Sequence, residues 1–433
     1  MARKVFLSVL GSTDYKECTY FDSDFTSSKT RFIQIAMCEK YVKNWSEVDV
    51  AYIFLTSGDK GSYKKNWLDN GHTKLGTTEP IMTQGLKGLI TSIKLPCKVL
   101  PVNIENGDNE EDIWKNFRII FDCLQSEDEV YFDVTHGFRS LPILVMVLNN
   151  YSKFLKSITV KSITYGNYEA RNATNEAPII NLTPLSLLQD WTIAANEFIN
   201  FGNADRIKKL TDLNITPILK ETKGQNQNAK NLKSLAKNLS DLSEDIKTNR
   251  GKAIIAGKTA TNIVNALAVL EQNIIAPLNP IIEKIKNSIS NFNQQEDAKN
   301  MLYAVKWCLE KNLVQEGFTL LQEGILSSLL LSDDYEDEKK RNFISGYLNQ
   351  YKTGKFENTR FNLPIPEVLK LEKLLSEIPK ITEWADIFSQ ITEIRNDINH
   401  AGIRQNPLKA KDFQSKLDVL YMKTNQLLSS SSC

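Results

Sequence analysis

The chain has 433 residues, of which 41% are hydrophobic and 24% charged, and its formal net charge is +1. This balance disfavours a protein that coats nucleic acid non-specifically, because such proteins carry a basic excess. No apolar run reaches the roughly 18 residues that a membrane span needs. The six cysteines are scattered without a C-x-x-C pair, which suits a reducing compartment. We therefore predict a cytoplasmic protein with no membrane partner, disulfide framework or metal site.

The first part of the chain alternates β-rich apolar runs with segments of helical spacing. Strands are predicted over 3–11, 49–57, 97–104, 129–137 and 157–166, with helices between them, for example over 30–45 and 112–125. Alternating strands and helices with nearly continuous apolar strands predict a Rossmann-like, doubly wound parallel sheet.

The pattern of apolar residues changes after the polar, proline-containing stretch 171–184, which is interpreted as a linker. From Leu185 onward, amphipathic helical segments dominate. We therefore predict an α/β domain over 1–175 followed by an all-α domain over 176–433.

Two nucleotide-binding motifs are missing. No G-x-G-x-x-G follows the first strand, so a dinucleotide cofactor is not expected. GKAIIAGKT (251–259) has one residue too many between its glycines for a phosphate loop and no strand before it. It is interpreted as a helix–helix connection.

Polar, glycine-bearing turns follow the predicted strands. Ligands of open parallel sheets bind beyond the carboxyl ends of the strands, where glycine N–H groups and Thr, Ser and Arg side chains donate to anions. The turns after the first and fourth strands supply the predicted ligand-binding residues, which are Gly11, Ser12, Thr13, Thr135, His136, Gly137, Phe138, Arg139 and Ser140. Two alternatives stay open. Ser140 only caps a helix with Pro142 in its first turn, and Arg139 is solvated or pairs with Asp133.

The segment EIRNDINHAG (393–402) holds the second candidate site, at a predicted helix end that Gly402 terminates. His400 is a natural general acid or base, and Arg395 is suited to bind a phosphate. Five residues at about 100° each place these two side chains roughly 140° apart on a regular helix. They share a site if the helix ends or distorts at the histidine, or if two copies combine across a two-fold axis. The structural alternative is a histidine that only interacts with the helix dipole.

Several of these segments together resemble one family. DVTHGFRSLP after a strand, the opening VFLSVLGST, the Trp191…Phe198…Gly202 pattern and RNDINH resemble CRISPR-associated proteins of type III systems that join a CARF domain to a HEPN domain. The resemblance implies that the first domain binds cyclic oligoadenylate, with cyclic tetra-adenylate as the expected ring. It also implies a homodimer whose second domain cleaves single-stranded RNA with Arg395, Asn396 and His400, where Asn396 orients the phosphate or the histidine.

These observations predict a cyclic oligoadenylate-activated, metal-independent endoribonuclease of type III CRISPR antiviral defence. RNA carries its own nucleophile, the 2′-hydroxyl, so the enzyme need only position it and move protons. The alternative is a non-catalytic nucleotide sensor whose helical domain recruits a partner. Glu323 is a weaker catalytic candidate and is interpreted as a solvated helix charge.

Overall fold

The structure is a computed structural model of the chain. It describes residues 2–68, 84–137, 139–270, 279–292, 295–330, 334–351, 354, 356–357 and 361–430. The predicted ligand residue Phe138 lies outside the described residues. The chain forms two compact units, residues 1–189 and 190–433.

The first unit is built on a seven-stranded sheet with the order β2-β7-β6-β5-β1-β3-β4. Its five central strands run parallel. They are β1 (Lys4–Val9), β3 (Val50–Thr56), β4 (Lys98–Ile104), β5 (Glu129–Asp133) and β6 (Thr159–Gly166). All five were predicted within a few residues of these bounds. Because the strand order reverses between β1 and β5, their carboxyl ends form the point where ligands bind in such sheets.

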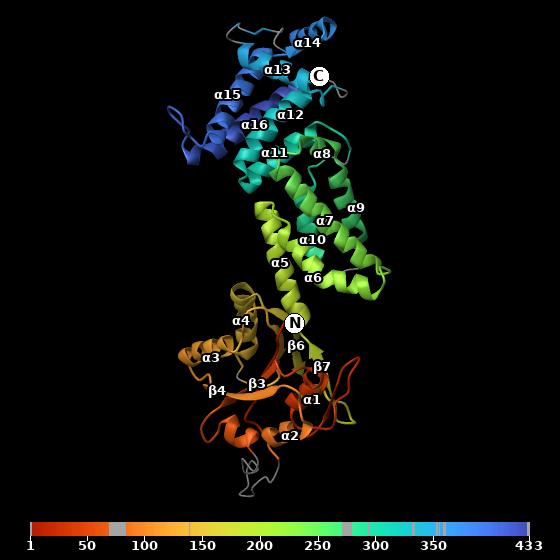
Figure 1. The fold of residues 1–433 in the computed structure, drawn as a ribbon, viewed down its shortest axis with the longest axis vertical. Coiled ribbons are helices and arrows are strands. Elements are labelled where there is room, and N and C mark those ends of the chain that lie inside the picture. The colour runs from red at the N-terminus through yellow and green to blue at the C-terminus, as the bar shows by residue number, and fades with distance from the viewer. Residues whose placement is uncertain are drawn as a thin grey trace. The chain divides into compact units, whose positions relative to one another are not determined.

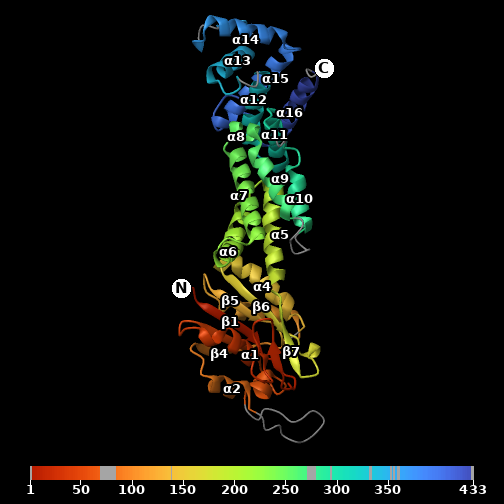
Figure 2. The same cartoon turned by 90° about the vertical axis from the view of Figure 1, so that its right-hand side faces the viewer.

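The other two strands correct the prediction of a wholly parallel sheet. β7 (Glu176–Asn181), labelled beside β6 in Figure 2, runs antiparallel to β6. β2 (Thr19–Phe21) pairs with β7. The chain between β6 and β7 is too short for a crossover, which explains the antiparallel pairing. The stretch 171–184 is therefore not a linker, because it contains β7, and the sheet extends past residue 175. Pro178 within β7 hides the strand from sequence patterns.

Helices cover both faces of this sheet (Figure 1). α1 (Ile33–Lys40) and α2 (Leu86–Ile93) pack with Phe6 and Ile53 on one face. α3 (Glu110–Asp122) and α4 (Leu141–Lys156) pack with Leu7 and Phe54 on the other. The two cores follow from the strand period, since neighbouring residues of a buried strand point to opposite faces.

The second unit is helical throughout its described residues, as the sequence predicts, and the division between units falls within α5. Its helices are α5 (Thr183–Phe201), α6 (Asp205–Glu221), α7 (Gln227–Lys247), α8 (Gly251–Ala256), α9 (Lys258–Leu270), α10 (Asn279–Ile289), α11 (Lys299–Lys311), α12 (Val314–Leu329), α13 (Glu338–Gln350), α14 (Ile365–Glu377), α15 (Ile381–Asn399) and α16 (Phe413–Ser430). The segment interpreted as a helix–helix connection, 251–259, instead forms α8 and the start of α9.

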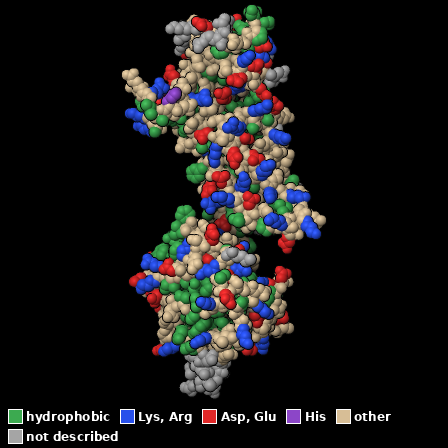
Figure 3. Space-filling view, in the orientation of Figure 1, with side chains coloured by type: hydrophobic (Ala, Val, Ile, Leu, Met, Phe, Trp, Pro, Cys, Tyr) green, Lys and Arg blue, Asp and Glu red, His purple; other side chains and the backbone are tan. Residues whose placement is uncertain are grey.

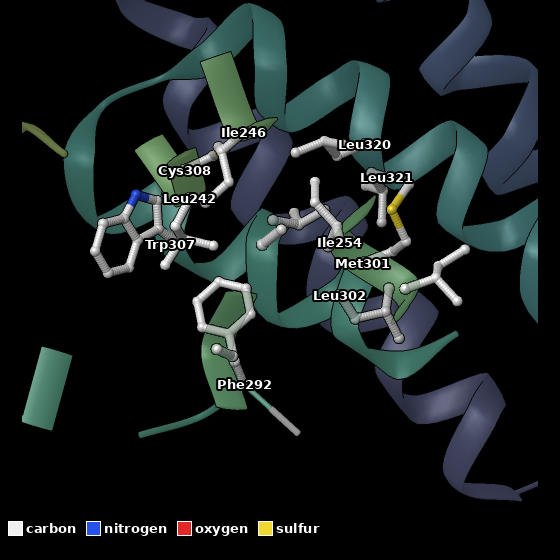
Figure 4. Close-up of a cluster of buried hydrophobic side chains, with 14 of the residues drawn as sticks. Leu242, Ile246, Ile254, Phe292, Met301, Leu302, Trp307, Cys308, Leu320 and Leu321 are labelled. Carbon is white, nitrogen blue, oxygen red and sulfur yellow. The ribbon is translucent and has the colours of Figure 1, made fainter. Parts of the chain in front are cut away.

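A buried apolar core fixes the helices that carry the second site. Ile254 of α8, Met301 and Trp307 of α11, and Leu320 and Leu321 of α12 point into one cluster (Figure 4). α15 packs in turn against α12, α13 and α16. Residues far apart in the sequence are thereby brought around α15.

Candidate functional site

The strand-end site comprises residues 11–13, 133–137, 139 and 140, at the carboxyl ends of the neighbouring strands β1 and β5. Ser8 of β1 lies opposite Asp133 of β5 in the parallel register. A Cβ placed on Gly11 would lie 3.4 Å from that of His136, and the Tyr15 ring stacks on the His136 ring with centroids 4.3 Å apart. The structure therefore brings together the two turns that were predicted from the sequence to bind a ligand.

Hydrogen bonds among buried or half-buried groups hold this site in place. The Ser8 hydroxyl donates to Asp133 Oδ2 at 2.6 Å, and the Thr135 hydroxyl donates to Oδ1 at 2.5 Å. Burial raises the pKa of Asp133, against the effect of these bonds. The Gly166 N–H also donates to Thr135 Oγ1 at 2.8 Å. Since its one hydroxyl proton is used, Thr135 shapes the turn and is a poor donor to a ligand.

His136 differs from its predicted role as a polar ligand group. Burial lowers its pKa to about 4, and its Nε2 is buried with no hydrogen-bond partner among the described residues. The imidazole is therefore neutral near pH 7 and brings no positive charge to an anion. Its stacking on Tyr15 ties the two turns together.

Arg139 is the exposed cation of the strand-end site. Its side chain is exposed and makes no hydrogen bond or ion pair with a described residue. Because Asp133 is bonded to Ser8 and Thr135, the alternative in which Arg139 holds the turn through Asp133 is wrong. Gly137 is exposed with φ of +131°, a left-handed conformation that only glycine adopts easily.

Ser140 precedes α4 as its N-cap, and its side chain makes no capping bond with the helix. Pro142 lies in the first turn, as expected from the sequence. The alternative in which the Ser140 hydroxyl only caps the helix is therefore wrong.

Two buried residues of the strand-end site were missed. The Asn66 amide donates to the carbonyls of Gly11 and Thr13 at 2.8 and 2.9 Å and holds the first turn, in which Ser12 is half-buried and Thr13 exposed. The Gln34 amide donates to Ser8 Oγ and to the Val9 carbonyl at 3.0 and 3.1 Å. In the sequence, Gln34 stands out as a polar residue within the apolar run FIQIAM, and this pattern could have indicated a buried polar residue.

The helix-end site comprises Arg395, Asn396, Asn399 and His400. α15 ends at Asn399, and His400 is its C-cap, one residue beyond the predicted last turn. Ala401 and Gly402 both adopt left-handed backbone, with φ of 54° and 69°, and the Gly402 N–H donates to the Asp397 carbonyl. This reversal explains why the helix stops there.

A cavity of about 620 Å³ opens beside α15. Its walls come from α8, α11, α12, α13 and α15 and from the segment before α13. They comprise Asn249, Gly251, Lys252, Ile255, Met301, Gln315, Thr319, Glu323, Ser327, Tyr335, Glu336, Arg341, Arg395 and Asn399. Arg395 and Asn399, one helical turn apart, line this cavity. Asn396 and His400 are exposed and lie outside its lining. Within one chain, therefore, Arg395 lines this cavity and His400 does not.

The cavity's charges are largely paired. Glu323 accepts from the Arg341 guanidinium at 2.6 Å, and Glu336 accepts from Lys252 at 2.8 Å. Glu323, interpreted from the sequence as a solvated helix charge, is partly exposed and ion-paired with Arg341. Arg395 has no carboxylate partner among the described residues. Its Nη1 donates to Gln322 Oε1 at 2.8 Å, and its Nε is buried without a partner.

On the other side of α15, a second cavity of about 500 Å³ separates the helix from the chain that follows it. Asp397 lines it, and its Oδ2 accepts from the Leu408 N–H at 2.7 Å. The Arg404 guanidinium donates to the Glu393 carbonyl at 3.1 Å. These bonds fold residues 400–408 back onto α15 and fix the backbone next to His400.

The fold and the two sites together define a two-part protein in which a Rossmann-like α/β unit precedes a helical unit. Residues 187–299 match the family model described as the second domain of CRISPR-associated protein MJ1674. The chain is similar to CRISPR-associated protein MJ1674 of Methanocaldococcus jannaschii, with 23% identity over 460 residues and 96% of this chain covered. It spans 64% of the length of that relative.

Both comparisons show similarity to a CRISPR-associated protein, in agreement with that part of the sequence prediction. The CARF and HEPN assignments stay predictions. Among the described residues, each helix is too short or too polar to cross a membrane.

Proposed function

We propose that this protein is an endoribonuclease of type III CRISPR defence, which cleaves single-stranded RNA without a metal ion when its α/β unit binds cyclic oligoadenylate. The observation that carries the proposal is the helix-end site. It combines an arginine without a carboxylate partner, in a polar cavity, with an exposed histidine at the end of the same helix. The relation to a CRISPR-associated protein supports this context.

The chemistry uses few groups. The 2′-hydroxyl of the substrate attacks the adjacent phosphorus, and the bond to the 5′-oxygen of the next nucleotide breaks. His400 transfers a proton to or from one of these oxygens, and Arg395 stabilises the charge that grows on the phosphate. Asn396, exposed beside Arg395, orients the phosphate or the histidine. The product ends are a 2′,3′-cyclic phosphate or 3′-phosphate and a 5′-hydroxyl.

A second copy of the chain resolves the separation of Arg395 from His400. If two helix-end sites face each other across a two-fold axis, the arginine of one copy can serve the histidine of its partner. An exposed apolar stripe on α4 supports self-association. Ile143, Val147, Tyr151 and Phe154 follow one another along one helix face with exposures of 70, 53, 46 and 82%. Hydrophobic side chains gather on this part of the first unit (Figure 3).

The strand-end site is the proposed sensor. Cyclic oligoadenylate carries one phosphate per nucleotide, and the exposed Arg139, the Ser140 hydroxyl and the backbone around Gly137 supply donors for it. Tyr15, stacked on His136, places an aromatic wall beneath the first turn. In a homodimer, two such sites would hold a two-fold symmetric ring.

Metal independence and product chemistry test the proposal. The activated protein is expected to cut a labelled RNA in excess EDTA and to leave 2′,3′-cyclic phosphate or 3′-phosphate ends. A single deoxyribose at the cut position should block cutting there and nowhere else, because it removes the nucleophile. Loss of all activity in EDTA, or 3′-hydroxyl ends, would show a different nuclease chemistry.

One observation favours the alternative function. Because Arg395 and His400 do not line the same cavity in one chain, a chain that stays monomeric would lack a complete site. It would then act as a nucleotide sensor whose helical unit recruits a partner. Measuring the oligomeric state together with RNA cleavage separates the two functions.

A further inference from the structure

Gln322 of α12 is buried next to α15, and its amide links two residues of that helix. Its Oε1 accepts from Arg395 Nη1 at 2.8 Å, and its Nε2 donates to Thr392 Oγ1 at 2.8 Å. The Thr392 hydroxyl in turn donates to the Phe388 carbonyl at 2.9 Å. Since its proton is used there, the Thr392 oxygen accepts from Gln322. The amide oxygen is thereby turned toward Arg395.

This relay, the hydrogen bonds that run from Thr392 through Gln322 to Arg395, leaves most N–H donors of the Arg395 guanidinium available to a ligand. The group has five N–H donors, and among the described residues it donates one hydrogen bond, to Gln322. Its buried Nε has no partner among the described residues. A buried donor without a partner costs free energy unless a ligand supplies an acceptor. The arginine is thus oriented by Gln322 and lacks an anion.

A second buried atom in the same cavity also lacks a partner. Asn249 Oδ1 is an acceptor without a donor among the described residues, and Asn249 lines the cavity with Arg395. The two carboxylates there, Glu323 and Glu336, are each paired with a cation. The cavity therefore offers an uncompensated positive charge and a separate acceptor for a ligand hydroxyl or amino group.

We propose that this cavity is a binding subsite for one nucleotide of the RNA, in which Arg395 binds the phosphate and Asn249 accepts from the ribose or base. Gln322 and Thr392 are positioning residues that hold the guanidinium in place. A volume of about 620 Å³ lies within the range of small-ligand pockets. The identification of the ligand as RNA rests on the proposed function. A nucleoside 3′-monophosphate is the smallest analogue of the expected product end.

Thr392 provides a matched pair of variants. Thr392→Val keeps the shape and removes the hydroxyl, so Gln322 loses the bond that sets its amide orientation. Thr392→Ser keeps the hydroxyl. Binding of adenosine 3′-monophosphate to the full chain is measured by calorimetry, with the melting temperature of each variant as a check on folding.

The wild-type chain is expected to bind this nucleotide. Arg395→Gln should weaken binding at least about tenfold, the effect of losing a hydrogen bond to a charged group. Thr392→Val removes a hydrogen bond between two neutral groups, so it should weaken binding about fivefold. Thr392→Ser should restore binding to within about threefold of wild type, the scale of a surface-like perturbation.

Equal binding by the valine and serine variants would overturn the relay. Absence of nucleotide binding by a wild-type chain that cleaves RNA would overturn the subsite and leave the proposed function standing. The predicted binding pattern in a chain that does not cleave RNA would support the subsite and refute the nuclease. The two failures are therefore distinguishable.

Discussion

The strand-end site and the helix-end site are assembled in opposite ways. At the strand-end site, sheet topology brings two sequence-distant turns together, and both turns are visible as polar, glycine-bearing segments after apolar strands. At the helix-end site, one short motif is visible, but Arg395 lines a cavity whose lining does not include His400. Motifs that follow neighbouring parallel strands therefore predict that their side chains lie close together. A motif on a helix predicts only how far apart its residues are along the chain.

The largest effect is expected from the acid–base group of the helix-end site. His400→Ala should lower RNA cleavage about 10²–10⁴-fold, the usual contribution of a positioned proton-transfer group. Binding of cyclic oligoadenylate should be unchanged, because the substitution lies in the other unit. Single-turnover cleavage and activator titration on the same preparation check both statements. Near wild-type cleavage would remove His400 from the mechanism.

The half-buried histidine of the strand-end site, His136, should make stability depend on pH. The pKa of His136 is about 4 in the folded protein, below its unfolded value of about 6.5. Between these values the unfolded state binds the extra proton, so stability falls as pH falls through this window. The expected loss from pH 7 to pH 4 is about 3 kcal/mol.

His136→Phe keeps the ring stacked on Tyr15 and removes the titration. Denaturant unfolding from pH 7 to pH 4 should therefore show a shallower loss of stability in this variant. Asp133 and the other carboxylates titrate in both proteins, so the difference isolates His136. Parallel curves for the two proteins would contradict a buried neutral histidine.

Arg139→Ala tests the cation of the strand-end site. It should weaken activator binding about 10- to 100-fold, because a hydrogen bond to a charged group contributes about 1.5–3 kcal/mol. The melting temperature should stay at the wild-type value, because Arg139 is exposed and does not bond to Asp133. RNA cleavage should recover at saturating activator. Unchanged affinity would remove Arg139 from the ligand site.

The smallest effect concerns the apolar stripe on α4. Phe154→Ser should weaken self-association about tenfold, the effect of losing about 1.4 kcal/mol, because Phe154 is the most exposed apolar side chain of the stripe. Val48→Ser is a matched control, because Val48 is also exposed, at 69%, and lies outside the stripe. Sedimentation equilibrium on both variants provides the measurement. Equal dissociation constants would place any dimer contact elsewhere.

Much of the fold followed from apolar periodicity. The five parallel strands were predictable because each is a compact apolar run, and the helical second half because its apolar residues recur at helical spacing. β7 was missed because it contains Pro178 within a polar stretch. The partners of the site residues were also missed. Gln322 and Thr392 reach Arg395 only through the packing of α12 on α15, and no local pattern records that contact.

One assay tests the central claim most directly. Purified protein is incubated with a labelled single-stranded RNA, alone and with cyclic tetra-adenylate or cyclic hexa-adenylate, beside the His400→Ala variant. The account predicts cleavage by the wild-type chain that one of the two rings stimulates and that the variant lacks. An intact RNA under all conditions, or equal cleavage by the variant, would contradict it.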